Sequence, residues 1–183
     1  GNKMEILARD LAPFDPLARP QEALAQLRAF RDAQPDVVGA GIIRADGQVL
    51  ATTLPSPRGR LPNMLSNPEM RADFESALRA NGLSLGRPQP GAIVGNWVIY
   101  VRQTVRDRRG QVRYLIQIGI PLEKQQALWH SLGLSPEAVL GLLRDDGYLI
   151  SRIPGPPSAD LYNRPTLGGA LYEAARAQPE SGY

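Results

Sequence analysis

The sequence contains no cysteine, and this absence removes three kinds of chemistry. A chain without thiols forms no disulfide, no zinc site built on cysteine and no thiolate nucleophile, although the absence does not select a cellular compartment. Histidine occurs once, as His130 beside Trp129, with no second histidine or cysteine to complete a metal site. We therefore predict no metal ion and no cofactor, and we expect His130 to have a surface or packing role.

Long apolar runs are missing as well. The best one, AIVGNWVIYV at residues 92–101, contains Asn96 and is shorter than the roughly 20 residues of a membrane-spanning helix. It is typical of a strand. The first residues show no charged region followed by an apolar core, so no signal peptide is visible. If the protein meets a membrane, its anchors lie outside this chain.

Neither sign of charge dominates the composition. Lysine and arginine number 21 against 18 aspartate and glutamate residues, and the net charge of +3 is too small to indicate a nucleic-acid partner. The densest basic cluster, Arg106–Arg109, is interrupted by Asp107 and followed by Gly110 between two apolar runs, which predicts a solvated hairpin tip. A hydrophobic content of 43% with 21% charged residues is ordinary for a folded, soluble domain.

A stretch near the end of the chain repeats one near its start. The segment IIRADGQVLATTLP begins at residue 42, and LLRDDGYLISRIP begins at residue 142. Apolar residues bracket an Asp-Gly pair in both, at residues 46–47 and 146–147. Aspartate tolerates the left-handed region and glycine accepts a positive φ without steric cost, so each copy predicts a β-hairpin. The pattern alone allows two unrelated hairpins or the repeat of a domain-sized unit.

The order of elements around the two copies favours the repeat. Helix, hairpin, proline-rich loop and helix come first, followed by a long strand pair in residues 97–121; helix, hairpin, loop and helix then recur. We predict that residues 37–53 and 97–121 form one antiparallel sheet, because neither hairpin can bury its apolar face alone. Residues 82–95, rich in proline and glycine, are predicted to be a loop.

The second copy lacks a counterpart of the long strand pair, so we predict an incomplete module. Such a half-domain leaves a sheet edge and an apolar face uncovered. We expect it to pack against the first module and to self-associate, with the predicted helix of Leu128, Trp129 and Leu132 bridging the two units. Residues outside this chain, or a strand from a neighbouring molecule, are the other ways to complete it.

Two short motifs resemble enzyme or nucleotide-binding signatures, but their context argues against both. GLSLG at residues 82–86 has the spelling of a nucleophile elbow, which requires a strand before the serine, whereas a helix is predicted there. GAGIIR at residues 39–44 begins like a dinucleotide fingerprint, but a hairpin follows instead of a helix. We therefore predict no catalytic residues.

Polar residues share one face of the strand that begins at Trp97. Period-two alternation puts Tyr100 and Arg102 together, where they could present a hydroxyl and a planar two-donor fork to a carboxylate. The alternative is a solvated outer face, with Arg102 paired to a neighbouring acid. If the strand faces the proline-rich loop after the first hairpin, Arg60 and Asn63 are the expected loop contributors.

These segments resemble the Cache family of extracytoplasmic sensor domains, whose fold is PAS-like. The resemblance rests on a helix, GIIRADGQVLAT, a proline-rich loop, a second helix and a tryptophan-led strand followed by VRDRRGQVRYLIQIGIPL. LLRDDGYLISRIP, Tyr162 and the closing SGY are similar to the second module of double-Cache sensors. The resemblance covers residues 20–183 and implies an α+β fold, with a PAS-like antiparallel sheet flanked by helices and then an incomplete second module.

The resemblance also implies a function. We expect the periplasmic, ligand-sensing part of a bacterial membrane receptor, not itself an enzyme, whose full-length protein carries a cytoplasmic diguanylate cyclase or histidine kinase. The expected ligand is small and polar or anionic, such as a carboxylate. The expected ligand-binding residues are Tyr100, Arg102, Arg60, Asn63 and Trp97.

The amino-acid-binding pattern of the family is broken, since no arginine stands two residues before Trp97 and no Trp-Tyr pair follows. The alternative function is a structural dimerisation module without a ligand.

The expected organisation has three parts. Residues 1–19 form an N-terminal segment, residues 20–125 the first, membrane-distal module, and residues 126–183 the linking helix with the truncated start of the second module. We expect a homodimer, anchored in the membrane through segments outside this chain. Its expected partner is a small-molecule ligand, not a nucleic acid.

Overall fold

The computed structural model describes residues 2–56, 59–90, 97–122, 133, 135, 137–156 and 158–177. The predicted helix with Leu128, Trp129, His130 and Leu132 lies outside these residues. The chain divides into two compact units, namely Gly1–Gly86 with Tyr100–Pro121, and Arg87–Ile99 with Leu122–Tyr183. A stretch from the middle of the sequence therefore folds with the C-terminal part of the chain.

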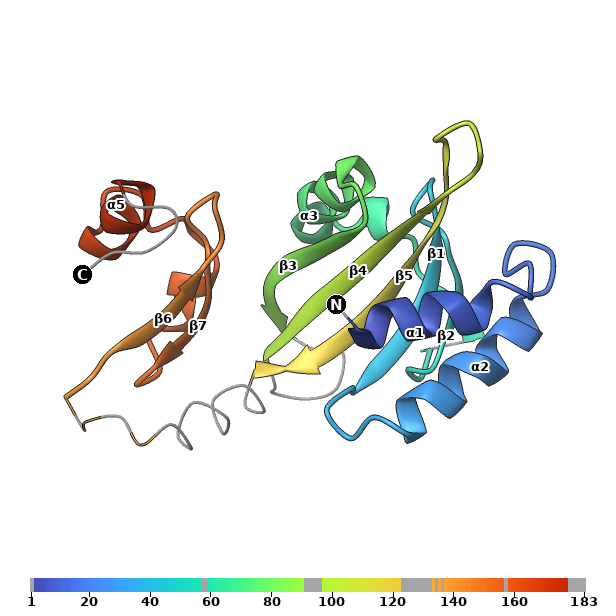
Figure 1. The fold of residues 1–183 in the computed structure, drawn as a ribbon, viewed down its shortest axis with the longest axis horizontal. Helices are drawn as coiled ribbons and strands as arrows, with labels where there is room; N and C mark the ends of the chain where they lie inside the picture. The colour runs from blue at the N-terminus through green and yellow to red at the C-terminus, as the bar shows by residue number, and fades with distance from the viewer. Residues whose placement is uncertain are drawn as a thin grey trace. The chain divides into compact units, whose positions relative to one another are not determined.

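One five-stranded sheet forms the framework of the fold (Figure 1). Its strands, in the spatial order β2-β1-β5-β4-β3, are β1 (Gly39–Arg44), β2 (Val49–Thr52), β3 (Leu83–Pro90), β4 (Trp97–Arg106) and β5 (Val112–Pro121). Strand β1 is antiparallel to both of its neighbours, and its register with β5 runs unbroken from Gly39↔Gly119 to Arg44↔Tyr114. The prediction that residues 37–53 and 97–121 share one antiparallel sheet is confirmed.

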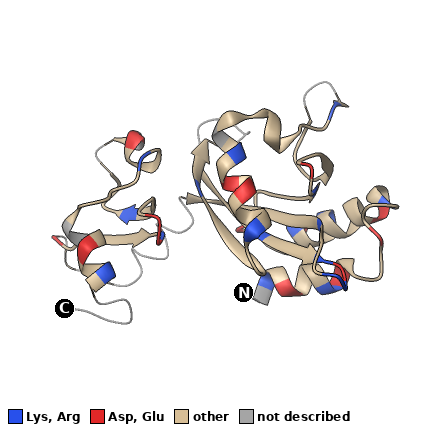
Figure 2. Ribbon diagram, turned by 90° about the horizontal axis from the view of Figure 1, so that it is seen from above, with Lys and Arg blue, Asp and Glu red and all other residues tan. Residues whose placement is uncertain are grey.

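Two N-terminal helices cover one face of this sheet, α1 (Asn2–Leu11) and α2 (Pro20–Asp32). Figures 1 and 2 both mark the N-terminus at the start of a helix, which Figure 1 labels α1, and Figure 1 shows α2 beside it. Helix α2 begins with Pro20 in its first turn. Helix α1 was not predicted, although Met4, Leu7 and Leu11 follow helical spacing and are buried in the core.

The opposite face is covered by the short helix η2 (Met64–Ser66) and by α3 (Pro68–Arg79). Side chains alternate along a strand, so successive residues enter different clusters. Ile42 packs with α1 and α2, whereas Ile43 packs with Phe74 of α3. Helix α3 thus covers the face of the sheet opposite α1 and α2.

Strand β3 corrects the prediction of a loop at residues 82–95. Its sequence, LSLGRPQP, contains two prolines, which argue against a strand because proline cannot donate a hydrogen bond to the ladder. At the edge of the sheet one side of the strand has no partner, and proline is tolerated there. Burial alternates as it does in a strand, since Gly86 and Pro88 are buried whereas Leu83 and Leu85 are exposed.

The second unit contains a two-stranded sheet, β6 (Leu140–Leu143) and β7 (Leu149–Ile153), followed by η3 (Ala159–Tyr162) and α5 (Ala170–Ala177). Among its described residues, an apolar cluster forms a core. The buried members of this cluster are Ile99, Leu122, Leu149, Ile150 and Tyr162, and Trp97, Leu143 and Leu161 pack against them. The hairpin thus buries apolar side chains against residues at the start of β4.

The two hairpin copies form the same hydrogen bonds. The Arg44 N–H donates to the Gln48 carbonyl at 2.9 Å, and the Arg144 N–H donates to the Tyr148 carbonyl at 2.9 Å. The turn glycines both lie in the left-handed region, with φ of +85° and +82°. In each copy this glycine's carbonyl accepts a backbone N–H from the following loop at 2.8 Å. The hairpins predicted from the two Asp-Gly pairs are confirmed.

Candidate functional site

The sheet face beneath α3 holds a group of buried polar side chains. Alternation along β4 places Tyr100, Arg102 and Thr104 on one face. The Thr104 hydroxyl donates to the Ala77 carbonyl of α3 at 2.8 Å, which fastens the helix to this strand. Asp73 comes from α3 and Gln117 from the neighbouring strand β5, so the group is built from three elements.

Arg102 is the centre of this group. Its Nη1 donates to Asp73 Oδ2 at 2.6 Å, and its Nε donates to Gln117 Oε1 at 2.8 Å. The side chains of Arg102 and Asp73 are each 1% exposed, so solvent screens neither charge and each depends on the other. The sequence left open whether Arg102 meets a ligand or a neighbouring acid on a solvated face; the acid is present, but the pair is buried. We call Asp73, Tyr100, Arg102 and Gln117 the Arg102 cluster.

One buried donor of the Arg102 cluster, the Nη2 of Arg102, has no hydrogen-bond partner in the described part of the chain. The Tyr100 hydroxyl comes from the same strand face, from a residue that is 8% exposed. The guanidinium carbon of Arg102 lies 5.4 Å from the centroid of the Tyr100 ring. Burial raises the pKa of the Tyr100 hydroxyl above its ordinary value of 10.0, and the Arg102 charge partly opposes this rise. At neutral pH the hydroxyl therefore keeps the proton that it can donate.

One glycine lies against the Arg102 cluster at a point where a side chain would collide with it. A Cβ on Gly86 of β3 would lie 2.7 Å from Asp73 Oδ2 and 3.0 Å from both Arg102 Nη1 and the Tyr100 carbonyl oxygen. Only glycine lets the β3 backbone approach the ion pair this closely. Two residues after Gln117 on β5, Gly119 pairs with Gly39 of β1, so neither strand carries a side chain at this pair.

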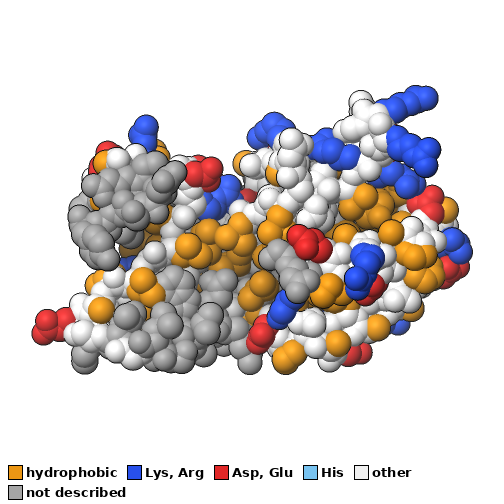
Figure 3. All heavy atoms as spheres, in the orientation of Figure 1, with side chains coloured by type: hydrophobic (Ala, Val, Ile, Leu, Met, Phe, Trp, Pro, Cys, Tyr) orange, Lys and Arg blue, Asp and Glu red, His pale blue; other side chains and the backbone are white. Residues whose placement is uncertain are grey.

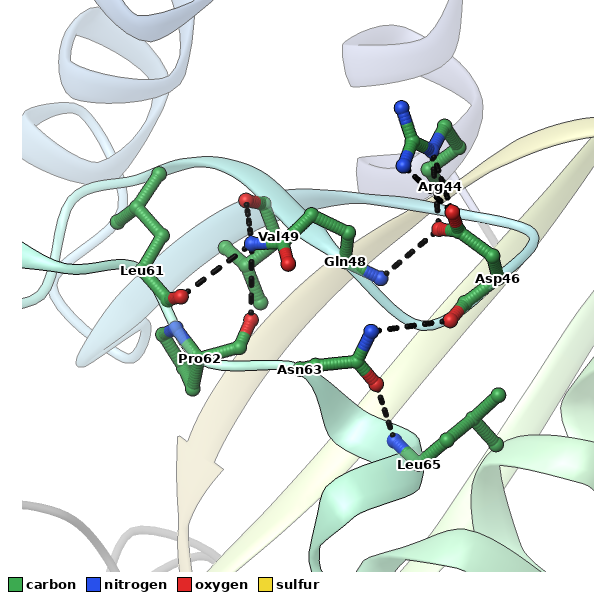
Figure 4. Close-up of polar contacts among 8 residues, drawn as sticks. All are labelled: Arg44, Asp46, Gln48, Val49, Leu61, Pro62, Asn63 and Leu65. Atoms are coloured by element: carbon green, nitrogen blue, oxygen red, sulfur yellow. Dashed lines mark hydrogen bonds and ion pairs between the residues drawn. The ribbon is translucent and has the colours of Figure 1, made fainter.

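Asn63, predicted to bind ligand, holds the first hairpin to the loop that follows it (Figure 4). Its amide nitrogen donates to the Asp46 carbonyl at 3.1 Å, and its amide oxygen accepts the Leu65 N–H at 2.8 Å as the N-cap of η2. Arg60 is exposed, and in the described residues no contact joins its side chain to the Arg102 cluster. The structure therefore brings Tyr100 and Arg102 together but places neither loop residue with them.

Trp97, the fifth predicted residue, belongs to the other compact unit. Its ring packs on Tyr162 with the ring centroids 5.1 Å apart. It is part of the cluster that buries Leu149 and Ile150, so its environment is that of a core residue. Its role in ligand binding remains a prediction without a contact to support it.

Two members of the Arg102 cluster were not predicted, although the sequence carries a signal for each. Asp73 stands directly before Phe74 and between Met70 and Ala77, where an acid interrupts the apolar stripe of a helix. Gln117 interrupts the apolar strand YLIQIGI. A polar side chain in a buried position requires a partner, so each interruption indicates a buried polar contact.

The Arg102 cluster offers hydrogen-bond donors and a buried ion pair, and no group of histidine, cysteine, aspartate or glutamate in the described ranges is arranged to hold a metal ion. Among the helices that the structure describes, none is both long and apolar enough to cross a membrane.

The basic cluster at residues 106–109 forms the tip of the β4–β5 hairpin. Arg108 and Arg109 are exposed there, and Asp107 Oδ1 accepts the N–H groups of Arg109 and Gln111 at 2.8 and 2.9 Å. Figure 3 shows the blue side chains gathered at this tip. The predicted solvated hairpin tip is confirmed. Arg106 instead points back, and its Nη2 donates to the Leu78 carbonyl at 2.9 Å.

Comparison with known proteins places the fold. No protein-family model and no curated protein matches this chain. Among solved structures, the extracellular domain of rpHK1S-Z16, assigned as a histidine kinase, matches with a TM-score of 0.69 at 19% identity, over 96% of this chain and 70% of that chain. The level of identity supports a shared fold.

Two chemoreceptor domains have the same fold. The ligand-binding domain of Campylobacter jejuni Tlp3, in complex with L-valine, matches with a TM-score of 0.58 at 13% identity, over 96% of this chain and 69% of that chain. The ligand-binding domain of Pseudomonas aeruginosa PctC, an amino acid chemoreceptor in complex with GABA, matches with a TM-score of 0.57 at 18% identity, over 98% of this chain and 74% of that chain. The predicted α+β sensor-domain fold is confirmed.

Proposed function

We propose that this chain is the extracytoplasmic ligand-sensing part of a bacterial transmembrane receptor, and that it binds a small polar molecule at the Arg102 cluster. The observation that carries the proposal is the fully buried Nη2 of Arg102, which has no partner in the described residues. A buried charged group left without a hydrogen bond is costly, so proteins rarely keep one without a use. The Tyr100 hydroxyl on the same strand face supplies a second donor.

The fold supports the receptor context. Its structural neighbours are extracellular or ligand-binding domains of a histidine kinase and of chemoreceptors. We propose that the β6–β7 hairpin starts a second module, because its hydrogen bonds repeat those of β1–β2. On this proposal the protein lies in the periplasm as a homodimer, with membrane anchors and a cytoplasmic cyclase or kinase outside the chain.

Calorimetry of an Arg102→Lys variant tests ligand binding at this site. Lysine keeps a positive charge for Asp73 but lacks the second planar nitrogen, so it removes the unpaired donor and leaves the ion pair possible. The probes are L-valine and GABA, which bind the structural neighbours, and acetate. We expect the variant to lose affinity by about tenfold or more, the worth of one charge-assisted hydrogen bond.

The matched control is Arg109→Lys, which makes the same substitution at the exposed hairpin tip. It should bind like the original chain. A probe that binds both variants equally well removes Arg102 from the site, and a chain that binds none of the probes counts against the proposed function for this class of ligand.

One observation favours a second function, that of a structural dimerisation module. Asp73 and Gln117 already occupy Nη1 and Nε of Arg102, so the cluster is largely satisfied by the protein itself. On this alternative the chain self-associates without a ligand. Sedimentation separates the two: a dimer that no probe changes, and that disperses when residues 142–183 are deleted, supports the structural module, whereas a monomer at high concentration argues against it.

A further inference from the structure

The described part of the chain contains one buried cation and one buried anion, and they are paired with each other. Its buried polar and charged residues are Asp73, Arg102, Thr104, Gln117 and Ser151, of which only the first two carry a charge. Asp73 Oδ2 lies 2.6 Å from Arg102 Nη1, and both side chains are 1% exposed. The unpaired Nη2 therefore lacks a hydrogen-bond acceptor, but the guanidinium does not lack a counter-charge.

This distinction decides which ligands the site can accept. A ligand that brings a net negative charge to Nη2 leaves two anions facing one buried cation, and like charges out of water repel strongly. A ligand without net charge can offer an acceptor oxygen to Nη2 and leave the buried charges balanced. A carboxylate side chain accepts several hydrogen bonds, so Asp73 can also serve as the counter-charge for a cationic group on such a ligand.

We propose that Asp73 is a specificity-determining residue that restricts the Arg102 cluster to ligands without net charge. This inference rests on the proposed function and makes it more specific. The sequence led us to expect a polar or anionic ligand, and Asp73 narrows this class. The accepted ligands have either a neutral acceptor oxygen or a charged one that is balanced by a cationic group on the same molecule. An arginine at this position without Asp73 beside it would select anions instead.

Asp73 is held in place beside Arg102 by the surrounding structure. It stands on α3, which Phe74 and the Thr104 hydrogen bond hold against the sheet. Gly86 brings the β3 backbone against the pair, so Asp73 and Arg102 have little room to separate. A free anion therefore cannot simply displace Asp73 from Arg102 without moving the helix that carries it.

Binding of matched pairs of probes tests the proposal. Each pair contains an amino acid and the carboxylate of the same length without its amino group: glycine with acetate, L-valine with 3-methylbutanoate, and GABA with butanoate. Calorimetry on the 183-residue chain should show that the zwitterion of a pair binds at least about tenfold more tightly than the anion. The Asp73→Asn variant, which keeps the shape but removes the charge, should reverse this order.

Asp73→Glu, which keeps the charge, is the matched control and should keep the preference for the zwitterion. If Asp73→Asn leaves Arg102 too poorly balanced to fold, the proposal requires that acetate or 3-methylbutanoate restore folding, since an anion can then take the place of the missing carboxylate. Thermal denaturation with and without each anion reads this out, and an Asp73→Asn variant that no anion rescues contradicts the proposal.

The remaining outcomes separate the role of Asp73 from ligand binding itself. Equal affinity of the original chain for both members of a pair overturns the role of Asp73 but leaves ligand binding intact. An unchanged preference in Asp73→Asn assigns the selection to other residues. If the original chain binds none of the probes, the proposed function fails for these ligands, and the inference fails with it.

Discussion

The rings of Trp97 and Tyr162 lie with their centroids 5.1 Å apart and their planes inclined by 43°. Trp97 begins β4 and Tyr162 ends η3, so the contact joins two elements far apart in the sequence. Tilted rings at this separation are a favourable geometry for an aromatic pair. Both residues belong to the cluster that buries Leu149 and Ile150 of β7. The pair therefore supplies the apolar support that a two-stranded sheet needs to be stable.

Removing the Tyr162 ring should loosen the β6–β7 hairpin. Tyr162→Ala deletes a buried aromatic side chain and should destabilise the hairpin by about 3 kcal/mol, whereas Tyr162→Phe keeps the ring and should cost about 1 kcal/mol or less. Hydrogen exchange of the β7 amides measures this locally, with the amides of β1 and β5 as the internal reference. Unchanged protection of β7 in Tyr162→Ala would show that the ring does not support the hairpin.

Alanine substitutions at two turn glycines should separate the energetic cost of backbone strain from the cost of steric crowding. Gly47 and Gly110 have similar positive φ values, +85° and +77°, but a Cβ on Gly47 would lie 2.6 Å from Asn63 Oδ1 whereas a Cβ on Gly110 would meet nothing within 4 Å. Gly110→Ala should cost about 1 kcal/mol, the strain of the left-handed region. Gly47→Ala should cost about 3 kcal/mol, because it also breaks the Asn63 cap. Equal urea midpoints for the two variants would show that the Asn63 contact adds nothing.

Local signals account for the parts of the fold that the sequence predicted. Each Asp-Gly hairpin is determined by a few neighbouring residues, and both hairpins formed as expected. Strand β3 was missed because its status depends on a distant partner, β4, while its own two prolines point to a loop. Tertiary pairing overrides local propensity in such a segment.

In the candidate site too, the sequence predicted what depends on local periodicity and missed what depends on tertiary packing. Tyr100 and Arg102 were placed together because period-two alternation is a local property of a strand. Their partner Asp73 depends on which helix covers that face, and one sequence contains no direct record of that. Asn63 was assigned to the ligand because of its loop, and that assignment stays a prediction; in the structure its amide bonds to the Leu65 N–H and the Asp46 carbonyl.

Gly86 should be essential to the Arg102 cluster. In Gly86→Ala the new Cβ meets Asp73 Oδ2 at 2.7 Å and the Tyr100 carbonyl oxygen at 3.0 Å, and the backbone oxygen cannot move aside as a side chain can. We expect a loss of about 2 kcal/mol in the free energy of unfolding and weaker binding of any ligand at Arg102. Thermal denaturation and calorimetry measure the two effects.

The matched control for Gly86→Ala is Ser84→Ala, two residues earlier on the same strand. The Ser84 hydroxyl is buried without a hydrogen bond in the described part of the chain, so its removal should leave stability unchanged or slightly higher. A Gly86→Ala variant as stable as Ser84→Ala would show that β3 can withdraw from the ion pair.

Alkaline pH should reveal the burial of Tyr100. Burial raises the pKa of its hydroxyl in the folded protein above the ordinary value of 10.0, with Arg102 partly opposing, so the folded state holds this proton more tightly than the unfolded state does. The stability that this contributes is fully present below pH 10.0 and is lost as the pH rises through the unfolded and then the folded pKa. Tyr100→Phe has no proton to lose, so its melting temperature should fall less than that of the original chain between about pH 9 and about pH 11.

Burial also raises the pKa of Tyr114 and Tyr162, which both proteins retain, so the difference between the two curves reports Tyr100 alone. Parallel curves would place the Tyr100 hydroxyl in contact with water.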